Sequence, residues 1–199
     1  MRKFVITLSP FMFVLFAGFS SLTKSDVVNY LNTRDTLVFN NVAYKLVWSS
    51  HPTDNYYKQE YIPASENVEK YNSMLFIDFL ITPDSAVNLV RQKIAEVKGR
   101  QNVDHFANFQ VMENETLHEY LLDFVMSNIN NGTFDTMEWN AYRYTAYTDK
   151  QGHRGILLFA YSKRSYEKAI FQFRRSLGAS RIADMKLFAA SDVPEVEVK

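Results

Sequence analysis

The residues best suited to chemistry in this chain are two aspartates that lie inside apolar, strand-like runs. Asp78 lies in the segment FIDFL and Asp123 in LLDFV, where the neighbouring side chains are expected to be buried. Burial disfavours an ionised carboxylate, and a carboxylic acid whose pKa is raised in this way suits acid catalysis. Side chains alternate along a strand, so Asp123 shares its face with Glu119, and that face is expected to be wet. Arg143 could pair with either aspartate, and an ion pair that only stabilises the fold is the simpler interpretation.

A stripe of aromatic residues offers a second possible site. It begins at Trp139 and continues along the same strand-like segment with Tyr142, Tyr144 and Tyr147. Such rings could stack on a sugar or a peptide. Aromatic residues are also common in strands, so ordinary sheet packing is the simpler explanation of the stripe.

Other kinds of chemistry find little support in the sequence. The four histidines are spread along the chain with no pairing four residues apart, so we expect no metal site and no cofactor. There is no cysteine, which excludes thiol catalysis and disulfides. The basic residues near the last expected helix are interpreted as its solvated side, with phosphate or an acidic partner as the alternative: Lys163, Arg164, Lys168, Arg174 and Arg175.

These residues must be positioned by a sheet and a few helices. A helix is predicted from the capping residue Asp84 to Gly99, and a last helix from Ser165, which Gly178 could break. The connections between the last four strands are short and rich in turn residues, which favours antiparallel pairing. The sequence therefore predicts an α+β fold, with a large antiparallel sheet and one or two long helices packed on it. Strands are expected over residues 36–39, 42–48, 56–61, 74–81, 106–112, 117–126, 137–147 and 155–162.

The first twenty residues have a different character from the rest. Two basic residues precede a nearly unbroken apolar run, which is the layout of a secretory signal peptide. We place the signal peptide at residues 1–20, with cleavage near Ser20; an uncleaved anchor stays open, because the run approaches the ~20 residues that span a bilayer. The predicted organisation is then a tether over 21–35, one domain over 36–190 and a flexible tail over 191–199.

The amino-acid composition limits the compartments and the partners that the protein could have. Lys and Arg together number 22 and Asp and Glu together number 22, so the chain lacks the long-range field that attracts nucleic acid. Without disulfides, its stability must come from a packed core. We expect a periplasmic or secreted protein that contacts a membrane only through the signal segment, if that segment is not cleaved.

A polar insert between two predicted strands, residues 59–75, carries several charged and aromatic side chains. Pro63 should end the preceding strand, and a helix of one or two turns is expected up to about residue 72. Tyr71 could fix this insert onto the core. The functional alternative places Glu60 and Glu66 near the mouth of a groove.

The insert also carries a resemblance. Its pattern is similar to one found in uncharacterised exported bacterial proteins, and the matching residues are Glu60, Tyr61, Pro63, Glu66, Tyr71 and Met74. The resemblance implies a secreted α+β protein and no known activity. In the order of its elements, the chain also resembles the domain of PsbP-type photosystem assembly factors and Mog1-type proteins, by analogy only.

A repeated tripeptide suggests covalent modification. Asp35-Thr36-Leu37 and Asp135-Thr136-Met137 resemble the acceptor of O-linked glycans on exported bacterial proteins. Thr36 and Thr136 are therefore possible O-glycosylation sites.

We expect an exported cell-envelope protein that binds a protein or a glycan. Two alternatives stay open: an inhibitor or immunity protein against a secreted toxin, and a hydrolase that uses a buried carboxylate. The residues proposed for binding are Glu60, Tyr61, Glu66, Tyr71, Asp78, Trp139 and Arg143.

Overall fold

The computed structural model describes residues 27–130 and 133–199. The predicted signal peptide and residues 21–26 of the predicted tether lie outside these residues. Within them, neither helix has the length and hydropathy that a membrane span requires.

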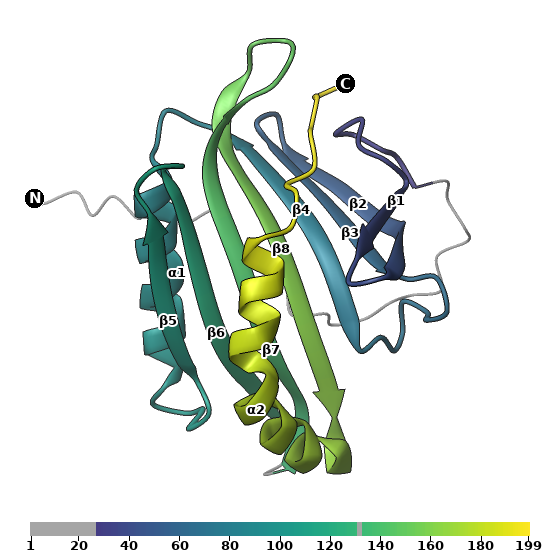
Figure 1. Cartoon of the computed structure of the whole chain (residues 1–199), viewed down its shortest axis with the longest axis vertical. Helices are drawn as coiled ribbons and strands as arrows, with labels where there is room; N and C mark the ends of the chain where they lie inside the picture. The colour runs from purple at the N-terminus through teal and green to yellow at the C-terminus, as the bar shows by residue number, and fades with distance from the viewer. Residues whose placement is uncertain (1–26, 131–132) are drawn as a thin grey trace, which may run out of the picture.

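A single antiparallel sheet of eight strands dominates the structure (Figure 1). Its spatial order is β1-β2-β3-β4-β8-β7-β6-β5, so the first four strands meet the last four where β4 pairs with β8. Every pair of neighbours is antiparallel. The strands are β1 (Thr36–Phe39), β2 (Val42–Thr53), β3 (Tyr56–Pro63), β4 (Ser73–Ile81), β5 (Asn108–Asn114), β6 (Glu119–Asn130), β7 (Thr133–Thr148) and β8 (Arg154–Tyr166).

The structure corrects the predicted α+β class. Strands take 48% and helices 22% of the structure, so this is a sheet-dominated fold on which two helices pack. One cause is that β6 and β7 reach into the polar stretch that the sequence suggests is a turn, up to Asn130 and from Thr133, and β8 extends into the expected start of the last helix. Another is that the helix of one or two turns expected before residue 72 is absent; turns and one isolated bridge, Asn67 to Lys70, occur there instead. Pairing along long hairpins overrides these local signals.

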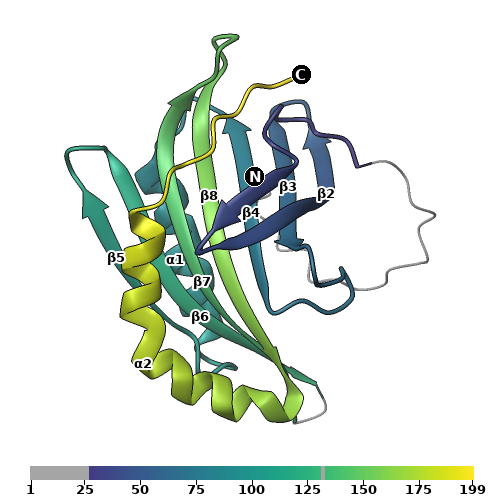
Figure 2. The same ribbon diagram turned by 45° about the vertical axis from the view of Figure 1, so that its right-hand side comes forward.

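Two helices cover opposite faces of the sheet. The helix α1 (Ala86–Arg100) packs on β5, β6 and β7, and α2 (Ile170–Ala189) packs on β7 and β8 from the other side (Figures 1 and 2). A short 3₁₀ turn, η1 (Glu167–Ala169), leads into α2. The helix α2 is continuous through Gly178, where the sequence suggests a break, and it bends along its length (Figure 2).

The strand alternation produces two apolar cores, one on each face. We call the side covered by α1 the α1 face and the side covered by α2 the α2 face. Phe124 and Tyr142 belong to the core of the α1 face, whereas Trp139 and Phe188 belong to that of the α2 face. Residues one position apart on β7 therefore have entirely different surroundings.

The C-terminal segment, residues 191–199, packs against the domain, in contrast to the predicted flexible tail. Val196 and Val198 are only 2% and 5% exposed, and both belong to the core of the α2 face. The Glu197 N–H donates to the carbonyl of Leu31 at 2.8 Å. The alternation of valine and glutamate in this segment places its apolar side chains inward, as in an edge strand.

Replacing a valine of this segment tests the docking. We expect Val196→Ala to lower the free energy of unfolding by about 2 kcal/mol, because two buried methyl groups are lost and a small cavity is left. Urea denaturation followed by circular dichroism measures the change. The control is Val38→Ala, at a side chain that is 73% exposed, where we expect less than about 0.5 kcal/mol. Equal effects of the two changes would mean that the tail is not docked in solution.

Candidate functional site

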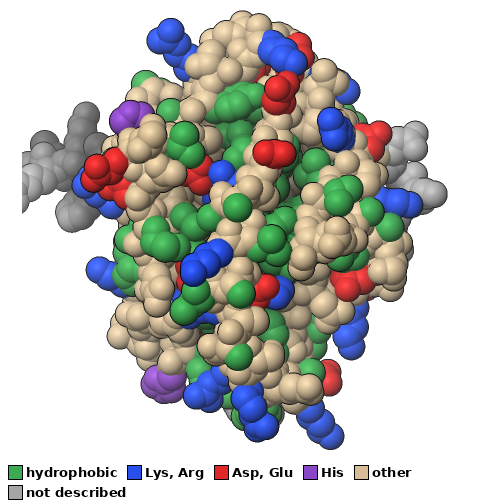
Figure 3. All heavy atoms as spheres, viewed as in Figure 1, with side chains coloured by type: hydrophobic (Ala, Val, Ile, Leu, Met, Phe, Trp, Pro, Cys, Tyr) green, Lys and Arg blue, Asp and Glu red, His purple; other side chains and the backbone are tan. Residues whose placement is uncertain are grey.

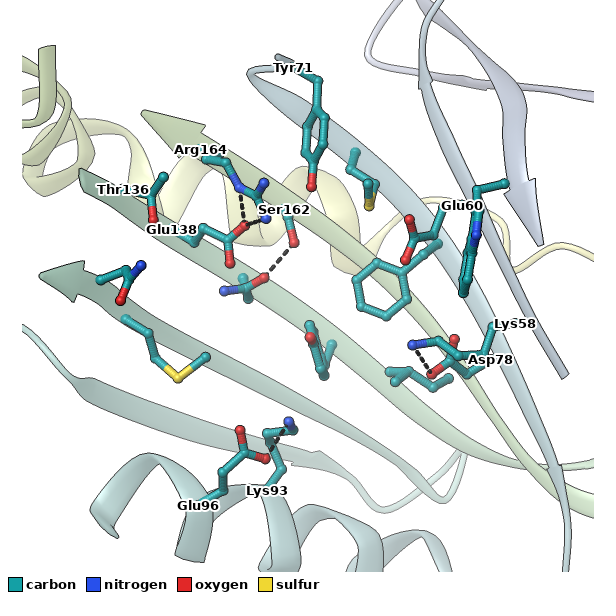
Figure 4. Close-up of a pocket in the computed structure, with 18 of the residues that line it drawn as sticks. Lys58, Glu60, Tyr71, Asp78, Lys93, Glu96, Thr136, Glu138, Ser162 and Arg164 are labelled. Carbon is teal, nitrogen blue, oxygen red and sulfur yellow. Dashed lines mark hydrogen bonds and ion pairs between the residues drawn. The ribbon is translucent and has the colours of Figure 1, made fainter. Parts of the chain in front are cut away.

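A cavity of about 700 Å³ lies on the α1 face (Figure 4). Its walls come from β2, β3, β4, β6, β7, β8 and α1, together with Tyr71 from the insert before β4. The helix α1 packs over β5 to β7, so the part of the face formed by β2, β3 and β4 is left hollow. A volume of this size is typical of sites for small organic molecules.

Glu60 is an acidic side chain of the cavity that has no partner, and it is more buried than the other one, Asp135. It makes no hydrogen bond or ion pair with any residue that the structure describes. Its directly opposed neighbours are Trp48 on β2 and Phe76 on β4, so an aromatic ring stands on each side of the carboxyl group. Burial raises the pKa of Glu60 to about 7; Lys58 opposes the shift and the nearby Asp78 adds to it. Near neutral pH, this group can therefore either donate or accept a hydrogen bond.

Asp78 lies diagonally across from Glu60 in the same wall and is 5% exposed. The Tyr56 hydroxyl donates to Asp78 Oδ2 at 2.7 Å, whereas Asp78 Oδ1 is buried without a partner. Lys58 Nζ lies 3.9 Å from Oδ2, too far for a good hydrogen bond, and offsets only part of the cost of burial. Burial therefore raises the pKa of Asp78, even though Lys58, the bond from Tyr56 and Lys93 favour its ionised form.

The remaining charges in the walls form two close pairs. Lys93 Nζ of α1 lies 2.6 Å from Glu96 Oε2, and burial lowers the pKa of Lys93 although Glu96 opposes this. On β8 and β7, Arg164 forms an ion pair with Glu138, and its guanidinium carbon lies 4.5 Å from the centre of the Tyr71 ring. Figure 4 shows these two pairs on different sides of the same space, one from the helix and one from the sheet.

Neutral hydrogen-bonding groups complete the cavity. The hydroxyl groups of Tyr142 and Tyr144 have no hydrogen-bond partner among the described residues, and burial raises the pKa of both well above the ordinary value, so both stay neutral donors. Ser162 donates to Asn140 Oδ1, while Asn140 Nδ2 is buried without a partner. Buried polar groups without partners are uncommon in folded proteins, and several converge here.

The structure brings together some of the residues that the sequence suggests for binding. Glu60, Tyr71 and Asp78 line the cavity, as does Thr136, one of the two threonines predicted to carry a glycan. Thr36, the other, is exposed at the start of the edge strand β1. Glu66 lies outside the cavity, where it accepts hydrogen bonds from the backbone N–H and side chain of Asn72.

The other predicted binding residues lie on the α2 face, away from the cavity. Tyr61 is fully buried, and its hydroxyl is within 2.5 Å of the Thr33 hydroxyl. The Trp139 indole N–H donates to Asp123 Oδ1 at 2.5 Å. All of these groups serve the packing beneath the helix α2 and the segment before β1.

The predicted surroundings of Asp123 and Arg143 are also corrected. Arg143 pairs with Glu119, with contacts of 2.6 and 3.0 Å, and not with either aspartate. Asp123 pairs instead with Arg181 of α2, at 2.8 Å. The face that carries Asp123 and Glu119 is not wet, because α2 covers it: the two carboxylates are 2% and 9% exposed.

Several residues of the cavity are not predicted as site residues from the sequence. Lys93 is the one with a recognisable signal, since it lies among the apolar positions of α1, next to Ile94 and three residues after Val90. Arg164 belongs to β8 and not to the solvated side of the last helix. Among the residues that the structure describes, no three His, Asp or Glu side chains group closely enough to hold a metal ion.

The raised pKa of Glu60 predicts a pH dependence of stability. In the unfolded chain this group has a pKa near 4.5, and in the folded protein about 7, so the folded state binds the extra proton between these values. The contribution of Glu60 to the free energy of unfolding is therefore most favourable below pH 4.5 and falls as the pH rises to about 7. We expect the free energy of unfolding of the wild type to fall by roughly 3 kcal/mol between about pH 4 and about pH 8 because of this group. The Glu60→Gln protein should not show this fall.

Urea denaturation of both proteins across this pH range measures the effect. The matched control is Glu69→Gln, at an exposed glutamate of the insert, which should follow the wild-type curve. If Glu60→Gln also followed that curve, the carboxyl group would not be desolvated in the folded protein.

Comparison with known proteins adds one finding, about relatedness. No curated protein and no solved structure gives a significant match to the chain. A family model matches residues 31–193, a span that takes in all eight strands and both helices. The match agrees with the resemblance to uncharacterised bacterial proteins, while the specific residue pattern and the analogy with PsbP-type domains stay predictions. The chain therefore belongs to this uncharacterised family.

Proposed function

We propose that this chain is an exported cell-envelope protein that binds a small polar organic molecule in the cavity of the α1 face. The observation that carries the proposal is the set of polar groups without partners around one cavity: the Glu60 carboxyl, the Tyr142 and Tyr144 hydroxyls, and the buried atoms Asp78 Oδ1 and Asn140 Nδ2. Polar groups that stay unpaired inside a protein cost stability. A ligand that hydrogen-bonds to these groups would supply the missing bonds, so their presence is explained by ligand binding.

A protein partner, including a toxin held by an immunity protein, is less well supported. Such a partner would need an exposed, well-packed patch, whereas the unpaired groups lie inside a cavity. On the side of the molecule that α2 covers, basic and acidic side chains are interspersed with apolar ones (Figure 3). Export rests on the layout of residues 1–20 and on the lack of cysteine.

A blocking substitution tests the proposed function. Thr136 lines the cavity and is half-buried, so Thr136→Trp should fill part of the space; Thr145→Trp, on the same strand but on the opposite face, is the matched control. We expect small polar molecules from a screened library to raise the melting temperature of the wild type and of Thr145→Trp, but not of Thr136→Trp. The proposal fails if no compound stabilises the wild type, or if the Thr136→Trp protein responds equally.

A hydrolase is the second candidate, because Glu60 combines a pKa of about 7 with a place in an aromatic cavity. In this reaction, the Glu60 carboxylic acid would give its proton to the leaving oxygen of a glycoside as the bond between that oxygen and the sugar carbon breaks. The oxygen of water would bond to the sugar carbon, and the proton that this water loses would restore the acid form of Glu60. We expect Glu60→Gln to lower any release of nitrophenol from nitrophenyl glycosides at least about a hundredfold. Turnover that is the same in the two proteins would exclude Glu60 as the acid, and absence of turnover would leave binding alone.

A further inference from the structure

Most of the charges in the walls of the cavity lie in pairs of opposite sign. Lys58 faces Asp78, Lys93 pairs with Glu96, and Arg164 pairs with Glu138. Of the other charged groups in the walls, Asp135 is exposed, and Arg100 donates to the carbonyl of Ser127 at 2.7 Å while its Nε is buried without a partner. A charged group that entered this space would lose its water and find one unpaired opposite charge at most: Arg100 for a phosphate or carboxylate, and Glu60 for an ammonium group. The cavity therefore favours a neutral ligand.

The register of the strands aligns a row of side chains across the cavity floor. Trp48, Glu60, Phe76, Ala160 and Tyr142 follow one another on the adjacent strands β2, β3, β4, β8 and β7. At one end of the row, aromatic rings stand on both sides of the Glu60 carboxyl group. At the other end, the rings of Phe76 and Tyr142 meet edge to face across Ala160, with centroids 5.1 Å apart. From Glu60 to Tyr142 the row crosses three strand spacings, about 14 Å. This length exceeds a single hexose ring.

The polar groups beside this row suit hydroxyl groups in particular. Glu60 can donate or accept, Tyr142 and Tyr144 can do either, and Asn140 Nδ2 in the next row can donate. A sugar hydroxyl also donates and accepts, while the C–H face of a sugar ring packs on an aromatic ring. An apolar ligand would leave all of these polar groups unpaired.

Resting on the proposed binding function, we propose that the ligand is a neutral oligosaccharide of two or three rings. One ring packs against Trp48 and hydrogen-bonds to Glu60, and the far ring reaches Tyr142 and Asn140. Tyr71, held beneath the guanidinium of Arg164, borders the same space and shows that the insert before β4 forms part of the wall (Figure 4).

Tryptophan fluorescence gives a direct readout. The chain has two tryptophans, and Trp139 is fully buried on the α2 face, so a change on adding ligand reports on Trp48. The probes are neutral di- and trisaccharides with α- and β-linked hexoses, and matched sugars that carry a free amine, a carboxylate or a phosphate. We expect a neutral sugar to change the fluorescence and each charged counterpart to bind at least about tenfold more weakly.

Variants separate packing from hydrogen bonding. By calorimetry, Trp48→Ala should weaken binding of the neutral sugar about tenfold, and Trp48→Phe should keep most of the affinity while abolishing the fluorescence change. Glu60→Leu should weaken it about tenfold or more, and Glu60→Gln only a few-fold, because the amide still donates and accepts. Phe171→Ala, at an aromatic side chain of α2 that is 64% exposed, is the control and should bind as the wild type does.

The outcomes distinguish this inference from the proposed function. A charged probe that binds more tightly than its neutral counterpart overturns the inference, and so does sugar binding that Trp48→Ala leaves unchanged. If no sugar binds but another small molecule does, and Thr136→Trp blocks it, the sugar assignment fails while the binding function stands. If no small molecule binds at all, both fail.

Discussion

The two-residue period of the strands is the constraint on which the rest of this structure depends. One sheet has to supply two faces, and each strand sends alternate side chains to each of them. On β7, odd-numbered Trp139 and Arg143 support α2, while even-numbered Asn140 and Tyr142 form the cavity. A slip of one residue in the pairing of β7 would exchange these two sets. The core and the cavity are thus fixed by the same register.

The two faces differ in how many of their buried polar atoms lack a partner: Asp78 Oδ1, Arg100 Nε and Asn140 Nδ2 on the α1 face, and Arg181 Nη2 on the α2 face. On the α2 face, buried charges are matched: Arg143 holds Glu119, and Arg181 holds Asp123 while Trp139 donates to the same carboxylate. On the α1 face, close to Glu60, the matching is incomplete. Proteins tolerate unpaired buried groups mainly where function requires them, because each lowers stability. The difference between the faces is therefore a physical argument that α2 completes a structural layer and that α1 borders a site.

The sequence reveals the elements of this protein better than its site. Strand periodicity and turn residues place all eight strands and both helices, because these signals are local. The extra length of β6 to β8 could not be predicted, since it depends on hairpin partners. Asp78 and Asp123 look alike in sequence, in FIDFL and LLDFV, yet one faces the cavity and the other faces Arg181. That distinction depends on which helix covers which face, and a single sequence does not show it.

The cavity is hard to predict from the sequence for a similar reason. Burial and the insert point to Glu60, Tyr71 and Asp78 in the sequence, but other charged residues of the cavity, Lys58, Lys93 and Glu138, come from three separate elements. The pairing of β4 with β8 brings these residues together, because it joins the two halves of the sheet. Long-range pairing of this kind leaves no pattern in a short window of sequence.

The docked C-terminal segment has a mechanical consequence. Glu197 and Lys199 donate to the carbonyls of Leu31 and Tyr30, respectively, so the two segments run antiparallel, with their outer ends at the same side. A force that pulls residue 27 and residue 199 apart therefore loads these bonds one after another, as in opening a zipper, and not all together in shear. The end of the chain should peel away under a low force while the eight-stranded sheet stays intact.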